Sequence, residues 1–168
     1  MGLNFLERME NKSSKGKKGK VGKGVAVTTT CASQTETLGE QLAKSLFPGA
    51  VLAFTGGLGA GKTTFTRGLA RGLGVTGRVT SPTYTIVNEY DQIPIPFIHF
   101  DMYRIGSSQE LFELGWDDYL EQGAIIAVEW AENIKDFLPA DTIWVDIQTL
   151  DEQRREITIT KGKIPWEF

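Results

Sequence analysis

The feature that most constrains this chain is a glycine-rich run between an apolar segment and an amphipathic one. Four glycines fall within residues 56–61, and Lys62 and Thr63 follow directly. This spacing satisfies the phosphate-loop pattern G-x-x-x-x-G-K-[ST]. Because glycine at such density costs backbone entropy, we interpret the run as a cradle of backbone N–H groups for phosphate.

The segments on either side supply the context that a phosphate loop requires. Residues 50–55, AVLAFT, form a short apolar run that predicts a buried parallel strand. From Lys62 onward, apolar residues recur at helical spacing as far as Gly74, which marks the end of a predicted helix. The positive end of this helix would face the phosphate, with Lys62 reaching the β- and γ-phosphates and Thr63 ligating Mg²⁺.

Apolar runs and capping signals elsewhere predict strands that alternate with helices. Ser33 and Glu36 form a capping box for a helix that ends near Pro48, and Ser107 opens two short helical pieces divided at Gly115. The predicted strands are residues 24–30, 50–55, 84–90, 96–101, 123–130, 143–147 and 157–159. The expected fold class is α/β, a three-layer P-loop NTPase fold whose mostly parallel central sheet is flanked by antiparallel strands.

Length and composition favour one domain without disulfides. A chain of 168 residues can bury a single core, and Cys31 is its one cysteine. No apolar run approaches the ~20 residues that span a bilayer, and the first residues lack the apolar core of a secretory signal. We expect a cytoplasmic protein without a membrane partner.

Charge is unevenly distributed along the chain. Residues 1–24 carry seven basic and two acidic side chains, a net charge of +5, whereas the whole chain has −3 and the remainder therefore −8. This acidic body does not favour a general nucleic-acid surface. We interpret residues 1–24 as a solvated, disordered arm, with contact to RNA or an acidic partner as the alternative, and residues 25–168 as one domain.

Two acidic residues that end predicted strands complete the candidate site. Asp101 ends FIHFD and Glu129 ends AIIAVE, so both carboxylates should lie beyond the carboxyl ends of their strands and face the phosphate loop. Either could hold the metal or its water, although each alone could also be a helix cap or a solvated loop acid. We interpret His99 as a core residue near the site and not as a base. Trp130 could stack on a base, meet a partner or belong to the core.

The absence of certain motifs from the sequence argues against some classes of nucleotide-binding protein. Neither the N-K-x-D loop that reads guanine nor a D-x-x-G motif occurs, which argues against a small GTPase. A kinase acting on a small metabolite is an alternative, with Asp101 as base and Arg104 as phosphoryl clamp. Such kinases usually place several arginines in a lid, and the corresponding region here offers only Arg104. A third interpretation is a nucleotide-gated binding module without catalysis.

Five segments, taken in order, resemble one family. They are GGLGAGKTTFTRGLARGLG, VTSPTYTIVNEY, FIHFDMYRI, ELGWDDYL and AVEWAE. In sequence and spacing they closely resemble TsaE, the small ATPase of bacterial tRNA threonylcarbamoyladenosine synthesis, also called the YjeE family, over about residues 28–159. The resemblance implies an ATPase that uses ATP and Mg²⁺, supports repeated turnover of the TsaD–TsaB complex and meets tRNA through that complex.

The resemblance also implies roles for individual residues. Lys62, Asp101 and Glu129 would be catalytic, and Thr63 with Glu129 would ligate the metal. Residues 81–83 would form a switch-like loop near the γ-phosphate. Contacts to the nucleotide would come from Gly56, Gly57, Leu58, Gly59, Ala60, Gly61, Lys62, Thr63, Thr64, Thr83 and Trp130.

One position departs from the family pattern. Gly57 stands where relatives commonly carry an acidic residue, as in G-D-L-G-A-G-K-T. That acid is not needed to cradle phosphate, but its absence makes the loop more flexible and removes any contact that the acid makes with a partner. No arginine finger is evident near the loop, so we expect slow intrinsic hydrolysis that a partner completes.

Overall fold

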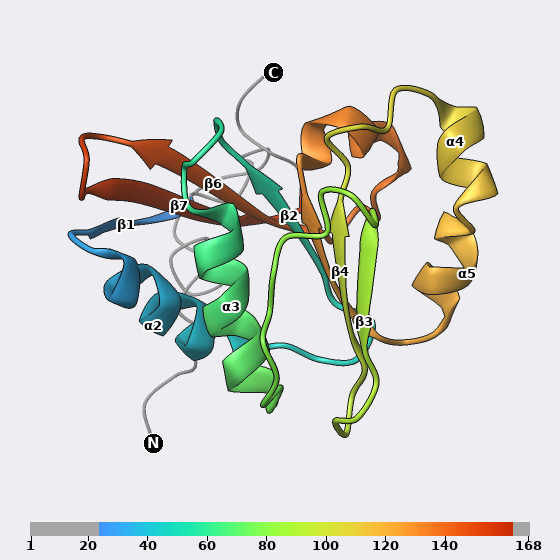
Figure 1. Ribbon diagram of the computed structural model, residues 1–168, viewed down its shortest axis with the longest axis horizontal. Helices are drawn as coiled ribbons and strands as arrows, with labels where there is room; N and C mark the ends of the chain where they lie inside the picture. Colours follow the sequence, from blue (N-terminus) through green and yellow to red (C-terminus); the bar gives the residue numbers. More distant parts are fainter. Residues whose placement is uncertain (1–23, 163–168) are drawn as a thin grey trace, which may run out of the picture.

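One mixed sheet of seven strands organises the computed structural model, which describes residues 24–162 (Figure 1). The strand order is β1-β7-β6-β2-β5-β4-β3. The strands are β1 (Val25–Thr29), β2 (Val51–Thr55), β3 (Val87–Tyr90), β4 (Phe97–Asp101), β5 (Ile125–Glu129), β6 (Ile143–Thr149) and β7 (Arg155–Lys161). The predicted arm, residues 1–24, lies outside the described residues apart from Gly24.

The central strands run parallel and the outer strands do not. β2 pairs in parallel with β5 on one side and β6 on the other, and β4 continues the parallel set beyond β5. β7 and β1 extend one edge antiparallel, and β3 extends the other. Because β2, β4 and β5 are covered on both faces, they are buried along their whole length. The predicted sheet, parallel at its centre and antiparallel at its flanks, is confirmed.

Helices on both faces of the sheet give three layers. One face carries α2 (Ala32–Ala43) and α3 (Lys62–Leu73), and the other carries α4 (Ser108–Glu113), α5 (Trp116–Glu121) and the 3₁₀ helix η1 (Ala131–Phe137). Each face has its own apolar core, one built around the edge-to-face rings of Phe54 and Phe65 and the other around Phe100 and Trp116. Within residues 24–162, no helix combines the length and apolarity needed to cross a membrane.

The predicted limits of α2 are wrong at both ends. Ser33 does not cap the helix: Cys31 takes the N-cap position, and the Gln34 side chain accepts a backbone N–H of the preceding turn at 2.8 Å. Ser33 therefore lies inside the first turn of the helix, and Cys31 at the N-cap makes no side-chain capping bond. The helix also ends at Ala43, before the Pro48 that was expected to stop it.

Strand β3 is shorter than predicted, because the segment that precedes it folds into a turn. Ile86 has a positive φ of 68°, which a strand does not allow. Its N–H donates to the carbonyl of Pro82 at 2.6 Å, so residues 82–86 close on themselves before β3 begins at Val87. The turn follows the S-P-T segment and lies directly beside the candidate site.

Helices α2 and α3 touch through glycines, which lets their backbones approach closely. A Cβ atom added at Gly68 would collide with the backbone of Glu36, and one at Gly39 would collide with the carbonyl of Phe65. Arg71 pairs with Glu36 and Glu40 at the edge of the same contact, at 3.1 and 3.0 Å. The position of α3, and of the loop that leads into it, is thus fixed by backbone-to-backbone packing.

We expect Gly68→Ala to destabilise the fold by at least ~1–3 kcal/mol, because the added methyl group must push α2 and α3 apart. Gly77→Ala is the matched control, since a Cβ at Gly77 has open space and its φ is not positive. Urea unfolding measures both. Equal stability of the two variants would contradict the close packing at Gly68.

Candidate functional site

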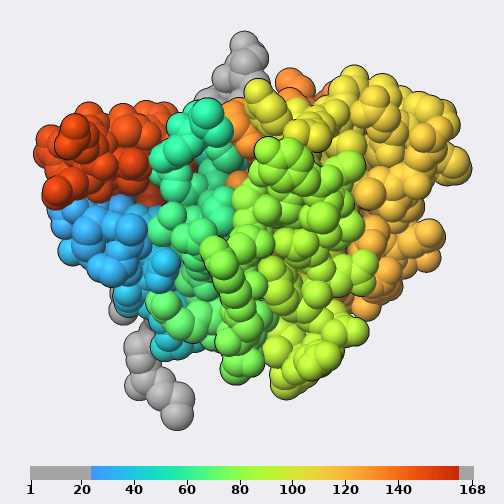
Figure 2. Space-filling view, viewed as in Figure 1, coloured from blue at the N-terminus to red at the C-terminus, as the bar shows by residue number. Residues whose placement is uncertain are grey.

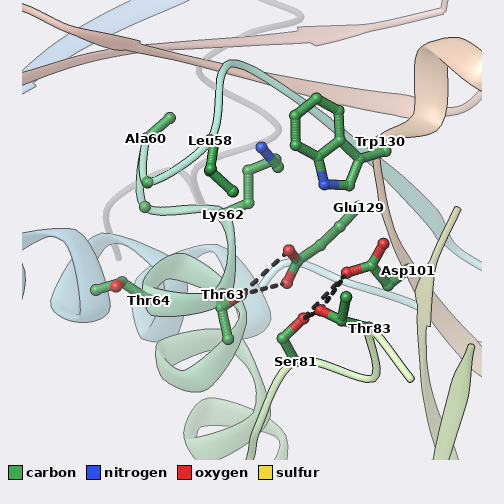
Figure 3. A pocket seen from close by; sticks show the side chains of 12 residues that line it. Leu58, Ala60, Lys62, Thr63, Thr64, Ser81, Thr83, Asp101, Glu129 and Trp130 are labelled. Atoms are coloured by element: carbon green, nitrogen blue, oxygen red, sulfur yellow. Dashed lines mark hydrogen bonds between the residues drawn. The ribbon is translucent and has the colours of Figure 1, made fainter. Parts of the chain in front are cut away.

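The phosphate loop forms one wall of an open pocket of about 320 Å³ at the carboxyl ends of β2, β4 and β5 (Figure 3). This is the edge of a parallel sheet at which ligands bind in α/β proteins. The pocket is lined by Leu58, Gly59, Ala60, Gly61, Lys62, Thr63, Thr64, Ser81, Thr83, Asp101, Glu129 and Trp130. Segments from four separate parts of the chain therefore meet here.

The backbone of the loop is arranged as an anion cradle. Gly56, Gly59 and Gly61 have φ values of 127°, 73° and 111°, which L side chains rarely adopt. Within residues 24–162, no acceptor takes the N–H groups of Gly59, Gly61 or Lys62. Free N–H groups at the start of α3 can bind an anion such as a phosphate.

Among residues 24–162, Lys62 supplies the one ammonium group that lines this pocket. The residue is 5% exposed, and its Nζ donates to the carbonyls of Gly56 and Gly57 at 2.5 and 2.9 Å. The same Nζ lies 3.9 Å from the centre of the Trp130 ring, a cation–π contact. Burial lowers the pKa of Lys62, while the nearby carboxylate of Glu129 acts in the opposite direction. The ammonium group is thus positioned at the loop, where it can bind a phosphate oxygen.

Glu129 is joined to the head of α3. Its carboxylate, on a residue that is 3% exposed, accepts the Thr63 hydroxyl at 2.8 and 3.1 Å and lies 2.8 Å from Nε2 of His99. Nδ1 of His99 is buried and has no partner among residues 24–162, which favours the tautomer whose hydrogen is on Nε2 and points to Glu129. His99 therefore lies in the core beside the site, as predicted, and orients Glu129.

Asp101 is held from the opposite wall. Its Oδ2 accepts hydrogen bonds from the hydroxyls of Ser81 and Thr83 at 3.0 and 3.1 Å, and its Oδ1 accepts the N–H of Tyr103 at 2.9 Å. The two hydroxyls are also 2.7 Å from each other. The predicted switch-like loop is thus attached to Asp101 through side chains, on the side of the pocket that faces Thr63 and Glu129 (Figure 3).

Trp130 lines the pocket beside Lys62. Its backbone has a positive φ of 58°, which is unusual for a residue other than glycine and is costly to maintain. Its ring packs on Tyr103 with ring centroids 4.9 Å apart, besides the contact with Lys62. Trp130 is thus partly packed against neighbours and partly a wall of the pocket.

The structure assembles almost all of the residues that the sequence predicts for the site. Gly56 and Gly57 are the exceptions, since they do not line the pocket and instead present their carbonyls to Lys62. Arg104, the predicted clamp of the kinase alternative, stacks on the ring of Tyr84 at 4.9 Å and does not line the pocket. A Cβ added at Gly57 would meet nothing within 4 Å, so the position that departs from the family pattern has room for a side chain.

Sequence reasoning missed two acids behind the phosphate loop. One oxygen of Glu132, Oε2, is buried without a hydrogen-bond partner among residues 24–162. Burial raises the pKa of Glu132; Lys62 lowers it and Asp146 raises it further. Asp146 accepts the Thr55 hydroxyl at 2.7 Å. The sequence signal for Glu132 was its place three residues after Glu129, but nothing in the sequence indicated that it would be buried.

The donor set of the pocket suits a hard cation that keeps other ligands. Thr63, Glu129 and Asp101 offer hydroxyl and carboxylate oxygens, which Mg²⁺ prefers. Within residues 24–162, no group of three or more His, Cys, Asp or Glu side chains could hold a metal by itself. The arrangement therefore fits a cation that is held jointly by a few protein oxygens and by the phosphates of a ligand.

Comparison with known proteins gives a consistent result. A family model described as "Threonylcarbamoyl adenosine biosynthesis protein TsaE" matches residues 29–157. A Bacillus subtilis protein named tRNA threonylcarbamoyladenosine biosynthesis protein TsaE is 41% identical over 132 residues, which are 79% of this chain and 82% of that protein. A Treponema pallidum protein of the same name is 34% identical over 128 residues, which are 76% of this chain and 94% of that protein.

A solved structure supports the fold as well. The crystal structure of Bacillus subtilis YdiB matches with a TM-score of 0.73 at 36% sequence identity, and the match covers 84% of this chain and 87% of that one. The expected P-loop NTPase fold is confirmed.

We expect Glu132→Gln to stabilise the protein at pH 7 and to change its stability little at pH 4. The folded protein keeps a proton on Glu132 at higher pH than the unfolded chain does, where the pKa is 4.5. Stability is therefore lost as the pH rises from about 4.5 through the raised pKa, and glutamine, which does not ionise, removes that loss. Urea unfolding at both pH values measures the effect.

The control for this substitution is Asp136→Asn, which alters an exposed acid on the same helix η1. It should leave stability unchanged at both pH values. A Glu132→Gln protein that is less stable than the original at pH 7 would mean that the carboxylate makes a favourable contact and that the pKa argument is wrong.

Proposed function

Because this chain belongs to the TsaE family of tRNA threonylcarbamoyladenosine biosynthesis proteins, we propose that it binds and hydrolyses ATP with Mg²⁺ in support of that modification. One observation carries the proposal. The free N–H groups of the phosphate loop, the Lys62 ammonium and the Thr63–Glu129 pair converge on one pocket. No other chemistry needs this combination as directly as the binding of a polyphosphate with its cation.

The loop and Lys62 would bind the phosphates. The N–H groups of Gly59, Gly61 and Lys62 have no protein acceptor within the described residues, so they are available to phosphate oxygens. Lys62 would exchange its bonds to the carbonyls of Gly56 and Gly57 for a bond to the β- and γ-phosphates. Its contact with Trp130 limits how far the ammonium group can move and keeps it beside the loop.

Thr63 and Glu129 would hold Mg²⁺, and Asp101 would assist the metal or the attacking water. Bound Mg²⁺ supplies charge neutralisation at the β- and γ-phosphate oxygens. Glu129 needs a fixed orientation for this role, and the His99 hydrogen bond provides it. Asp101, held by Ser81 and Thr83, can orient a water molecule by accepting a hydrogen bond. The protein's contribution is then positioning and charge, without a covalent intermediate.

Among residues 24–162, no arginine lines the pocket, so the site lacks a guanidinium to stabilise the transferring phosphoryl group. Slow hydrolysis by the protein alone follows, since such an arginine is worth about 10³–10⁵ in rate where it occurs. We propose that the TsaD–TsaB complex is the partner that completes or resets the site, and that tRNA is reached through this complex. The proposal rests on the family and on the open pocket.

The kinase alternative receives less support from the geometry. Arg104 stacks on Tyr84 and is not among the residues that line the pocket. A kinase needs such a guanidinium at the transferring phosphoryl group.

We expect Lys62→Ala and Glu129→Ala each to lower phosphate release about 100-fold or more while the fold survives, because each removes charge stabilisation from the reacting phosphates. Phosphate release is measured with ATP and with GTP, in the presence and absence of purified TsaD–TsaB. Circular dichroism and thermal unfolding check the fold of each variant. Lys44→Ala and Glu113→Gln, which alter exposed charges away from the pocket, should retain the original rate.

The same assay separates the alternatives. Stimulation of plain phosphate release by TsaD–TsaB supports the proposed function. Consumption of ATP only after a phosphorylatable small molecule is added would indicate a kinase. Tight ATP binding with no phosphate release under any condition would indicate a binding module. Original rates in both Lys62→Ala and Glu129→Ala would overturn the proposed site.

A further inference from the structure

We propose that Arg155 is a positioning residue of the phosphate loop, which it holds against the β6–β7 turn, residues 150–154. Arg155 is the first residue of β7, 95 positions from the loop residue that it contacts. The proposal deepens the proposed nucleotide function and rests on it. Figure 2 shows the loop segment on the same face as the red β6–β7 strands and next to them.

One guanidinium group joins the loop and the turn. Nε of Arg155 donates to the carbonyl of Ala60 at 2.9 Å. Nη1 donates to the carbonyls of Asp151 and Arg154 at 2.8 and 2.9 Å, with Glu152 at a longer 3.4 Å. Arginine remains charged at every relevant pH and presents its donors in a rigid plane, so the turn and the loop are held in a fixed relation.

The bond to Ala60 determines which way the next N–H points. The described chain has no cis peptide bonds, so in the peptide between Ala60 and Gly61 the C=O and the N–H lie on opposite sides. With the C=O directed at Arg155, the Gly61 N–H is directed away from Arg155, and Gly61 lines the pocket. Arg155 therefore keeps a donor, and not a carbonyl oxygen, facing a bound phosphate.

The loop needs such a restraint because Gly61 contributes one of the two dihedral angles about which this peptide rotates. Gly61 has a φ value of 111°, and a glycine at this position can change φ at little steric cost. Rotation would bring the Ala60 carbonyl toward the phosphate and repel it. Within residues 24–162, Arg155 makes the one side-chain hydrogen bond to the backbone of residues 58–61.

The same hairpin supports the strand end of the loop. Asp146 on β6 accepts the Thr55 hydroxyl at 2.7 Å. Gly56 lies so close to the carbonyl of Ile147 that a Cβ atom would not fit between them. These contacts fix the loop where it leaves β2, and Arg155 fixes it where it enters α3. The hairpin thus holds both ends of the loop.

The test uses Arg155→Ala, with Arg154→Ala as the matched control. Arg154 is the neighbouring residue, carries the same charge and pairs with Asp151, but does not contact the loop. Binding of Mg·ATP is measured by calorimetry, and backbone hydrogen exchange of residues 56–64 is measured in the protein without nucleotide. We expect Arg155→Ala to weaken Mg·ATP binding about tenfold, as for loss of one charge-assisted hydrogen bond, and to speed exchange in the loop. Arg154→Ala should leave both within twofold.

Every outcome of this test either supports or overturns the proposed role of Arg155. Equal weakening in the two variants would mean that Arg155 acts by its charge alone and would overturn the proposal, as would unchanged affinity and exchange in Arg155→Ala. If Arg155→Ala does not fold, Arg155→Lys replaces it, since lysine keeps the charge but cannot reach the turn and Ala60 together; the same shifts, smaller in size, are expected. Failure of the unaltered protein to bind Mg·ATP would overturn the proposed function, while the exchange comparison would still test Arg155.

Discussion

The hydrogen bonds between Thr63 and Glu129 join the first turn of α3 to the end of β5. Thr63 opens α3 on one face of the sheet, and Glu129 ends β5 at the centre of the sheet. A carboxylate that is 3% exposed is costly unless its oxygens find donors, and here a hydroxyl and an imidazole supply them. The cost of burying this charge is thus offset only when helix, strand and neighbouring strand are in register.

That requirement explains why the parallel core is arranged as it is. His99 and Glu129 come from adjacent strands, β4 and β5, which pair in parallel with Asp101 opposite Glu129. Parallel pairing brings the ends of both strands to one edge, so the two acids of the site arise from neighbouring strand ends. Antiparallel pairs extend the sheet beyond this parallel core, with β3 next to β4 at one edge and β7 next to β6 at the other.

Much of this could be predicted from the sequence, for identifiable reasons. The continuous apolar runs of β2, β4 and β5 predict strands that are covered on both faces, and these strands are buried along their whole length. The Ser107 capping box was confirmed, since the Ser107 hydroxyl accepts the N–H of Glu110. The Ser33 box was wrong because the helix starts earlier, with Cys31 at the N-cap position and Ser33 inside the first turn. Contacts such as Arg155 with Ala60 depend on the order of strands across the sheet, and local patterns contain no information on that order.

Turns with unusual backbone conformations could not be predicted from the sequence either. The positive φ of Ile86 shortened a strand whose β-branched residues predict extended structure, and tertiary contacts prevailed over that local preference. The half-buried position of Glu132 likewise depends on the tertiary packing of η1, which the local sequence pattern does not indicate.

The glycine contact between α2 and α3 leaves the site with one rigid wall and one that can yield. Backbones in direct contact cannot slide, so α3 cannot shift to accommodate a larger or smaller ligand. The opposite wall, residues 81–86, is joined to Asp101 through hydroxyl groups and ends in the strained Ile86, with Tyr84 exposed at its tip. Any displacement of residues 81–86 would therefore move the exposed Tyr84 and leave the two apolar cores in place.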